Sequence, residues 1–221
     1  MTTPQAPVRT VPPTHTVPSV PTDLATVVQV LAVMVAALVL LRAVAALAAG
    51  GDLAAWVGDR PSPAVTAVGV LSTVAVLGQV LAGILGCVWL HLHVLNARLL
   101  NPAGWHDRAP LWAYLGWVAP IVCLWFPYQV VRDGAASVGA PTRPVGWWWA
   151  TWLALQVLAA VEVVVATRVV DDATPLVAAA VVSALATAAA AVLWVRVVRS
   201  MTAAAEGSHR RWLGEVDTVV A

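Results

Sequence analysis

The stretch "GWVAPIVCLWFPYQVVRDG", Gly116 to Gly134, determines how many times the chain crosses a membrane. It is apolar enough for a bilayer, yet it contains two prolines, Pro120 and Pro127. Proline removes a backbone donor, clashes with the carbonyl four residues earlier and pushes the preceding residue towards extended geometry. A straight helical crossing is therefore costly. The stretch predicts either a re-entrant segment, which dips in and returns to the same side, or a kinked fifth crossing.

The composition of the whole chain indicates an integral membrane protein. Of its 221 residues, 61% are hydrophobic and only 10% are charged, against roughly 25% charged residues in soluble domains. A soluble fold of this size could not cover its core with so few charges. The net charge is +1, and no basic patch interleaved with aromatic residues is present, so nucleic acid is not an expected partner. All basic residues are arginines, which together with the abundant alanine and valine suggests a high-GC bacterial genome.

Apolar runs long enough for transmembrane helices follow one another along the chain, because an α-helix rises about 1.5 Å per residue and the hydrocarbon core is roughly 30 Å thick. They begin at Leu24, Ala64, Trp147 and Leu176. We therefore predict an all-α membrane protein, a bundle of four transmembrane helices plus the Pro-broken segment. The predicted organisation is a disordered Pro- and Thr-rich tail over residues 1–23, a single transmembrane helical domain over 24–199 and a short cytoplasmic tail over 200–221.

The positions of the arginines predict the orientation, because cytoplasmic loops carry an excess of basic residues. With four crossings and a cytoplasmic N-terminus, the arginines left outside are Arg42, Arg60 and Arg168. With five crossings and an external N-terminus, they are Arg9, Arg98, Arg108 and Arg168. Four crossings fit the rule better by one arginine, although both numbers of crossings stay open. Either way, we predict a multi-pass protein of the bacterial cytoplasmic (plasma) membrane with a cytoplasmic C-terminus.

A set of residues around the Pro-broken segment carries a resemblance to a known family. They are Trp89 and Asn96, then Gly116, Trp117, Pro120, Leu124, Pro127, Tyr128, Val130, Val131 and Arg132, then Trp148, Trp149 and Trp152. This pattern resembles a family of uncharacterised actinobacterial multi-pass membrane proteins classed as a domain of unknown function. The resemblance implies a membrane fold and no particular activity. Cys123 stands where the family pattern has Asn, and it would bond backbone groups freed at the break poorly.

Two ionisable residues, Arg42 and Glu162, lie well inside apolar runs. An intramembrane charge is a functional-site hypothesis by default. With a cytoplasmic N-terminus both residues lie in the outer half of the membrane, about 27 Å and about 22 Å along their helices, so we predict that they pair. A structural ion pair is favoured over a transport or proton-relay role, and Arg42 could instead snorkel to the surface. Gln29, Gln79 and Gln156 are expected to form hydrogen bonds between helices.

Other residue types point to structure more than to chemistry. His91 and His93 are two residues apart and would point about 200° apart on a helix, so we predict no metal site and no cofactor. Trp147, Trp148 and Trp149 open an apolar run, which favours an aromatic belt at the membrane interface over a binding platform. The chain also lacks a nucleophile elbow, a His-Glu-x-x-His motif and a Gly-rich phosphate loop, so no catalytic residue is predicted.

These observations favour a non-enzymatic accessory or scaffold subunit of a larger membrane assembly, because polar interior residues are few. The expected partners are the lipid bilayer and other membrane-protein subunits. A small transporter or channel is the alternative, and it would need a continuous polar path from Arg42 past Gln156. A membrane-embedded enzyme is the third possibility, and it would need a polar cluster at the inner face.

Overall fold

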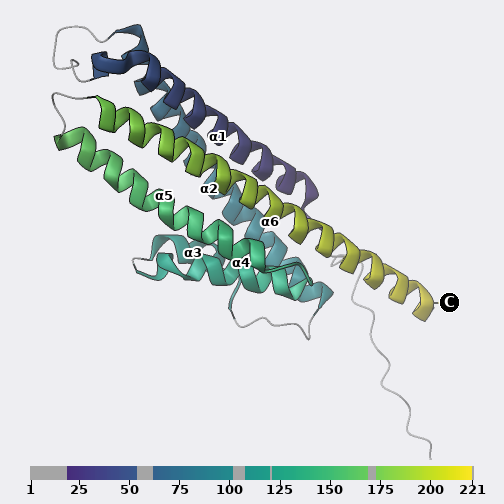
Figure 1. Ribbon diagram of the computed structural model, residues 1–221. Helices are drawn as coiled ribbons and strands as arrows, with labels where there is room; N and C mark the ends of the chain where they lie inside the picture. Colours follow the sequence, from purple (N-terminus) through teal and green to yellow (C-terminus); the bar gives the residue numbers. More distant parts are fainter. Residues whose placement is uncertain (1–18, 54–61, 102–107, 120, 169–172, 221) are drawn as a thin grey trace, which may run out of the picture.

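A computed structural model describes residues 19–53, 62–101, 108–119, 121–168 and 173–220, and these described parts are almost entirely helical (Figure 1). The α-helices are α1 (Thr22–Ala49), α2 (Pro63–Leu100), α3 (Trp112–Val118), α4 (Phe126–Ser137), α5 (Arg143–Arg168) and α6 (Thr174–Val220). Two short 3-10 turns, η2 (Gly50–Leu53) and η3 (Val122–Leu124), complete the described structure. The predicted all-α class is confirmed.

Four of these helices, namely α1, α2, α5 and α6, are long and apolar enough to cross a membrane, which confirms the predicted bundle of four. Their outward surfaces carry large apolar side chains: Val33 and Leu41 on α1, Val76 and Leu77 on α2, and Val163 on α5 are more than half exposed. Such surfaces suit a hydrocarbon solvent, and they would be unfavourable in water. The chain is therefore organised as a multi-pass membrane protein.

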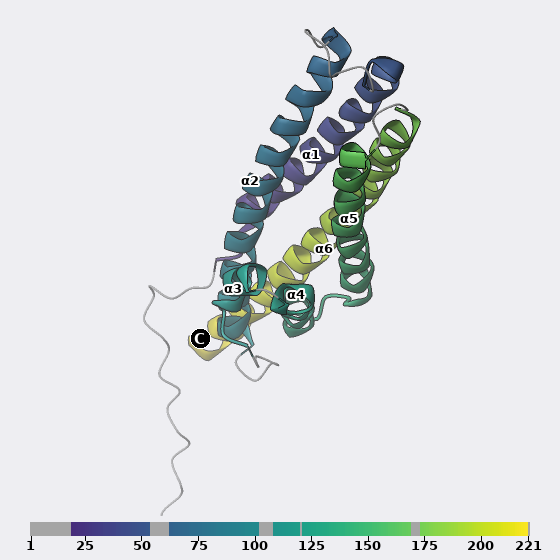
Figure 2. The ribbon, with the colours of Figure 1, turned by 90° about the vertical axis from the view of Figure 1, so that its left-hand side faces the viewer.

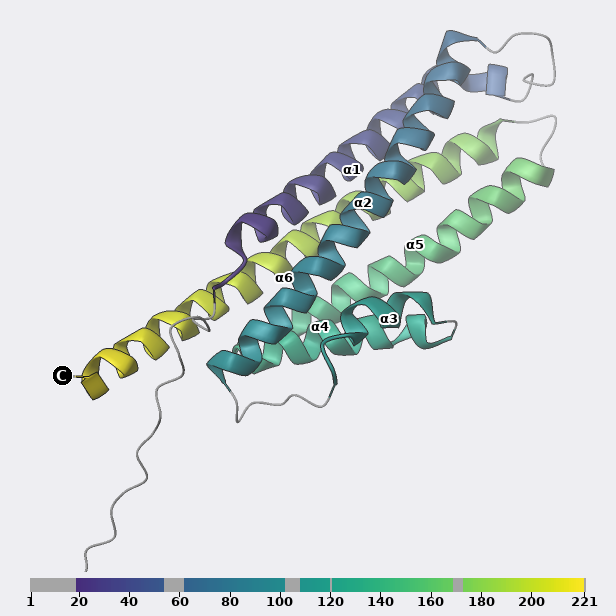
Figure 3. The same cartoon turned by 180° about the vertical axis from the view of Figure 1, so that it is seen from behind.

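The spanning helices form an open, curved row in the order α2, α1, α6, α5. α1 packs against both α2 and α6, and α5 packs against α6, whereas α2 and α5 stand at the two ends of the row (Figure 2). α1 and α5 run away from the end where α2 finishes, and α2 and α6 run back towards it (Figure 1). The short helices α3 and α4 lie at that end, between α2 and α5 (Figure 3). We call it the hairpin end of the bundle.

α3 and α4 fold back on each other and do not make a fifth crossing. Arg108, just before α3, forms an ion pair with Asp133 in the second half of α4. Gly116 packs so closely on the start of α4 that a Cβ built on it would lie 3.5 Å from the Cβ of Phe126. Both ends of the α3–α4 hairpin therefore lie at the same end of the bundle, and the kinked alternative is not formed.

The break in this hairpin follows from the local sequence. α3 ends at Val118, and Ala119 has φ −72° and ψ 119°, the extended geometry expected before a proline. Pro120 itself lies outside the described residues. Pro127 is buried in the first turn of α4, where its missing N–H costs nothing. Phe126 was expected to be extended but instead begins α4, because its ring packs against the ring of Trp112 at a centroid distance of 4.5 Å.

α6 is the longest element, and it continues well past the bundle at the hairpin end (Figure 1). Met201 and Ala205 are still buried in this part, and Arg199 donates a hydrogen bond of 2.8 Å to Gln29 of α1. The helix therefore does not stop at residue 199, where the sequence predicted the transmembrane domain to end. The predicted cytoplasmic tail over residues 200–221 begins as a continuation of the same helix.

Candidate functional site

The intramembrane charges Arg42 and Glu162 meet between α1 and α5. The Arg42 Nη2 atom lies 2.7 Å from Glu162 Oε1, and Nη1 lies 3.3 Å from Oε2, so the guanidinium grips the carboxylate with two parallel bonds. The two side chains are only 18% and 24% exposed. The pairing predicted from their matching depths is therefore present, and it joins two helices that are not neighbours in the row.

This ion pair lies on the same helix faces as a cavity in the bundle. Seven residues make almost two helical turns, so residues seven apart share a face. Arg42 follows Val35 by seven residues on α1, and Glu162 follows Leu155 and Trp148 at the same spacing on α5. Val35, Leu155 and Trp148 all line the cavity. The ion pair therefore lies beyond the end of the cavity that is farther from the hairpin.

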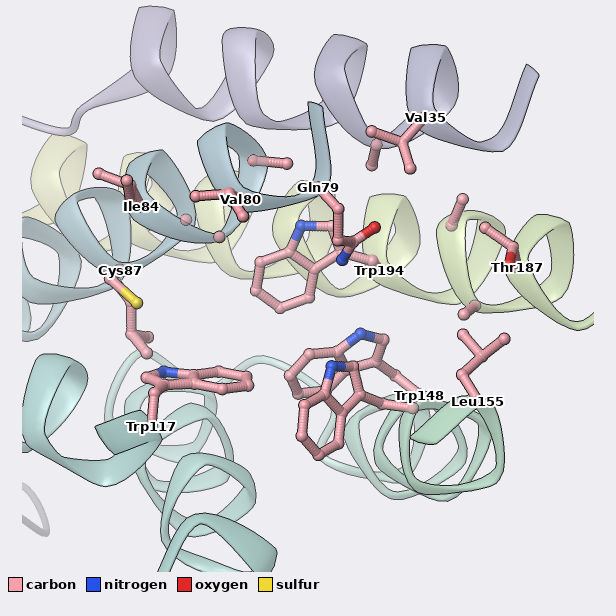
Figure 4. A pocket seen from close by; sticks show the side chains of 18 of the residues that line it. Val35, Gln79, Val80, Ile84, Cys87, Trp117, Trp148, Leu155, Thr187 and Trp194 are labelled. Atoms are coloured by element: carbon pink, nitrogen blue, oxygen red, sulfur yellow. The ribbon is translucent and has the colours of Figure 1, made fainter. Parts of the chain in front are cut away.

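The cavity has a volume of about 450 Å³ and lies between α2 and α5, with α6 behind it and α3 at its hairpin end. Indole rings from three helices surround it: Trp117 of α3, Trp148 and Trp152 of α5, and Trp194 of α6 (Figure 4). The α2 wall consists largely of small and aliphatic residues, among them Ala82, Gly83, Ile84 and Gly86. The size and the apolar lining are those of a small-molecule site.

The indole rings form a connected array. Trp149 and Trp152 stack with their centroids 4.6 Å apart, and Trp117 contacts the Trp152 ring at 5.4 Å. Trp148 and Trp194 are 4.6 Å apart. Aromatic pairs at such distances contribute about 0.5–1.5 kcal/mol each beyond their area burial. The array therefore holds α3, α5 and α6 at fixed positions around the cavity.

The expected interface belt at the start of α5 is only partly present. Trp147 is 60% exposed and faces outward, whereas Trp148 and Trp149 are 6% and 7% exposed and point into the protein. The prediction was wrong for these two because an indole ring suits an interface and an interior equally well. The signal that could have separated them is helical phase, since Trp148 shares a face with Leu155 and Glu162.

Polar groups are few in the cavity wall. Figure 4 shows the Gln79 amide directed towards Trp194 and the Cys87 side chain directed towards Trp117. The Thr187 hydroxyl is already engaged, because it donates to the Ser183 carbonyl at 2.7 Å. In the described chain, the Trp117 Nε1 atom is buried and has no hydrogen-bond partner. The wall can therefore hold an apolar molecule.

A polar cluster lies at the hairpin end of the bundle, where α2, α3 and α4 meet. Arg98 donates a hydrogen bond to the carbonyl of Arg108, Arg108 pairs with Asp133, and Arg132 Nη2 lies 3.0 Å from Asp133 Oδ1. The Arg108 guanidinium also lies over the Phe126 ring, 5.5 Å from its centroid. Two guanidinium groups, those of Arg108 and Arg132, thus share the Asp133 carboxylate, and a third, that of Arg98, bonds the backbone of Arg108. We call Arg98, Arg108, Arg132 and Asp133 the guanidinium cluster.

Sequence reasoning did not find the guanidinium cluster. The arginines were used to assign a side of the membrane, and only folding of the hairpin brings Arg108 next to Asp133. The hydrogen bond to Asp133 raises the pKa of the Arg132 guanidinium above its ordinary value. Arg108 and Arg132 carry two formal positive charges against the single negative charge of Asp133.

The hairpin is fixed to the bundle through its backbone carbonyls. Trp149 Nε1 donates to the Leu124 carbonyl at 3.1 Å, as expected of a cover for the broken backbone. His93, fully buried in α2, contacts the Gly134 carbonyl at 3.4 Å, and His91 contacts the Pro110 carbonyl at 3.1 Å. The two histidines thus bind separate carbonyls. Groups of histidine, cysteine and acidic side chains suited to a metal do not occur in the described ranges.

The remaining predicted residues are distributed over the bundle. Asn96 donates a hydrogen bond of 2.6 Å to the Ser19 carbonyl just before α1. Cys123 is a half-buried free thiol in η3, and its backbone N–H donates to the Ala119 carbonyl at 3.0 Å. Gln156 is exposed on α5 and makes no interhelical hydrogen bond within the described chain.

Of the other two glutamines, Gln29 and Gln79, only the first bonds to another helix in the described chain. Gln29 links α1 to α6 through Arg199, as predicted. Gln79 lines the cavity and, like Gln156, has no interhelical hydrogen bond in the ranges that the structure describes. A glutamine in an apolar run therefore did not suffice to predict a contact between helices.

Comparison with protein families matches residues 59–203, about two-thirds of the 221 residues, to a domain of unknown function, DUF4328. The match covers α2 through most of α6, and so includes the hairpin and nearly all of the cavity wall. No curated protein and no solved structure matches the chain. The expected membership of an uncharacterised family is confirmed in this form: the chain belongs to the DUF4328 family.

Proposed function

We propose that the chain is a non-enzymatic accessory subunit of a larger assembly in the bacterial cytoplasmic membrane. The observation that carries this proposal is the two-bond pairing of Arg42 with Glu162. These two charges neutralise each other, so the cavity beside them holds no free ionised group with which to bind an ion or move a proton. Intramembrane charges that serve transport must interact with their cargo. Here the two charged side chains bond to each other instead.

The geometry favours the accessory role over the two alternatives. A transporter needs a polar path, and Gln156, which was expected to extend such a path, lies on an exposed face of α5. An enzyme needs groups that can exchange protons or attack a substrate. In the guanidinium cluster the carboxylate of Asp133 is held by Arg108 and Arg132, and guanidinium groups do not release protons near neutral pH.

We also propose an orientation with the hairpin end in the cytoplasm. Arg98, Arg108 and Arg132 lie at that end, and so do Arg143 at the start of α5 and Arg199 on α6. Basic residues concentrate on the cytoplasmic side of bacterial membrane proteins. Both the start of α1 and the extension of α6 then face the cytoplasm, where an extended helix is accessible to a partner.

Co-purification tests the accessory role. The chain, tagged at its C-terminus and expressed at its native level, would be extracted from native membranes in a mild detergent. We expect a second membrane protein to co-elute in a fixed molar ratio over successive columns. A tagged, unrelated four-helix membrane protein expressed at the same level is the control. Recovery of the chain alone, or only with proteins that the control also captures, would contradict the proposal.

A further inference from the structure

The size of the cavity restricts what can occupy it. One turn of a transmembrane helix, about 10 Å across and 5.4 Å long, takes up about 400 Å³. A cavity of about 450 Å³ therefore could not accommodate a partner helix over the several turns that a stable contact needs. A flexible hydrocarbon chain, which is narrow and apolar throughout, fits both the volume and the wall of indoles and small residues.

The cavity is open towards the bilayer. α2 does not pack closely against α5, and the residues along this gap are exposed: Val80 is 55%, Ile84 56% and Val118 80% exposed. Gly83, between the two α2 residues, is exposed as well. All four line the cavity. A hydrocarbon chain can thus enter sideways from the membrane without crossing a polar barrier.

α3 connects the hairpin end of the cavity to the guanidinium cluster. Tyr114 of α3 lines the cavity, and its ring lies 5.0 Å from the ring of His91. His91 in turn contacts the carbonyl of Pro110, two residues after Arg108. α3 therefore leads from the positive cluster to the apolar wall. A phospholipid has the same order of groups, a charged end followed by an apolar chain. Its phosphate lies in a headgroup layer about 5–7 Å deep above the acyl chains.

From this arrangement we infer that the cavity binds one acyl chain of an anionic phospholipid whose phosphate lies on the guanidinium cluster. Arg108 and Arg132 together carry one more positive charge than Asp133 neutralises, which complements a phosphate. Basic pockets between transmembrane helices bind acidic lipid headgroups in this way. This site does not depend on the accessory role.

Native mass spectrometry tests the site. The full chain would be reconstituted in phosphatidylcholine nanodiscs that contain one-tenth phosphatidylglycerol, then released in a mild detergent. We expect one phosphatidylglycerol molecule to stay bound, with a preference of at least about fivefold over phosphatidylcholine, as one basic residue near a lipid phosphate provides. Equal retention of the two lipids would overturn the proposal. So would a co-purifying protein that occupies the cavity in place of lipid.

Two matched pairs of variants locate the lipid. Gly83→Phe fills the mouth of the cavity, and Gly69→Phe adds the same ring to an exposed part of α2 outside it. A Cβ at either glycine meets nothing within 4 Å, so both variants can fold. Gly83→Phe should retain less than about a fifth of the bound lipid, whereas Gly69→Phe should retain all of it. If the two variants retain the same amount, the acyl chain does not lie in the cavity and the inference is wrong.

The second pair tests the headgroup. Arg132→Gln removes a guanidinium of the cluster whose side chain is 42% exposed, and Arg143→Gln removes an exposed arginine outside it. Arg132→Gln should weaken phosphatidylglycerol binding about fivefold and leave the weak phosphatidylcholine binding unchanged, while Arg143→Gln should change neither. Loss of both lipids in Arg132→Gln, or equal effects of the two variants, would contradict a phosphate on the cluster.

Discussion

At the scale of single residues, Arg42 and Glu162 dominate the energetics of the apolar interior. A charge taken out of water is costly, and it becomes acceptable only when its partner is well placed. The two bonds between the guanidinium and the carboxylate meet this condition. The Arg42 Nε atom, by contrast, is buried and has no partner in the described chain. The pair therefore fixes the relative positions of α1 and α5 more than it adds to net stability.

Removing one member of this pair should be more harmful than removing both. We expect Arg42→Gln and Glu162→Gln each to lower the free energy of unfolding by about 3–5 kcal/mol, because each strands an uncompensated buried charge. The double variant should lose less than the sum of the two. Thermal unfolding in detergent, with Arg143→Gln as an exposed control, measures the effect. Simple additivity would show that the two residues do not interact.

Gly78 is the second residue that controls a helix contact. A Cβ added there would lie 3.2 Å from Cγ2 of Val35 on α1, whereas one added at Gly69 of the same helix meets open space. Replacing a helical glycine with alanine normally stabilises by roughly 1 kcal/mol. Gly69→Ala should show this gain, and Gly78→Ala should lose it through overpacking, which costs about 1–3 kcal/mol. Val35→Ala should restore the gain. Equal melting temperatures for the two alanine variants would contradict the close contact.

At the scale of elements, the α3–α4 hairpin shows how broken backbone is accommodated in this fold. Contacts from α2 and α5 hold the carbonyls of the hairpin in place. Asp133 closes its open end by pairing with Arg108, which precedes α3. The closure and the covering contacts are separate, so they can be tested separately.

Loss of the Asp133 carboxylate should open the hairpin without unfolding the bundle. In Asp133→Asn the Arg108 and Arg132 guanidiniums lose their shared counter-ion and repel each other. We expect hydrogen exchange to accelerate several-fold at the amides of α3 and η3 and to stay unchanged in α1. Asp23→Asn, a change at an exposed acidic residue in the first turn of α1, is the control. An unchanged exchange rate in α3 would mean that the ion pair does not close the hairpin.

At the scale of the whole molecule, the ends of α1 and α5 and the starts of α2 and α6 lie at one end of the row α2–α1–α6–α5, and the hairpin lies at the other. Cysteine labelling in intact cells checks this orientation. In a background with Cys87→Ala and Cys123→Ala, single cysteines would replace Asp52, Ala136 and Arg210, all of which are exposed. An impermeant thiol reagent should label Asp52→Cys in intact cells, and Ala136→Cys and Arg210→Cys only after lysis. Labelling of Ala136→Cys from outside would reverse the proposed orientation.

Much of the fold was predictable because it depends on properties of short stretches of sequence, namely hydropathy, helix rise and proline geometry. Hydropathy and rise per residue define the four spans, and the same arithmetic matched the depths of Arg42 and Glu162. Proline geometry predicted the end of α3. Phe126 departed from that geometry because a tertiary contact, the packing of its ring on Trp112, outweighed a local preference.

The cavity and the guanidinium cluster were not predictable, for a different physical reason. Both depend on the order in which helices neighbour one another, and hydropathy is nearly the same on every side of a transmembrane helix. Nothing local indicates that α2 and α5 stand apart, or that the ring of Trp148 packs against that of Trp194. Likewise, Arg108 and Asp133 are distant in sequence and meet only because the hairpin returns.

The continuity of α6 has a mechanical consequence. Without a break from Thr174 to Val220, it is a rod about 70 Å long, more than twice the roughly 30 Å of the hydrocarbon core. Such a rod behaves as a lever whose fulcrum lies among its contacts with α1 and α5. A change of about 5° in its tilt about a point near the middle of the helix would move each tip by about 3 Å, since each arm is about 35 Å long. A partner protein bound to the tip would thus be displaced in the aqueous phase whenever the tilt of α6 within the lipid changes.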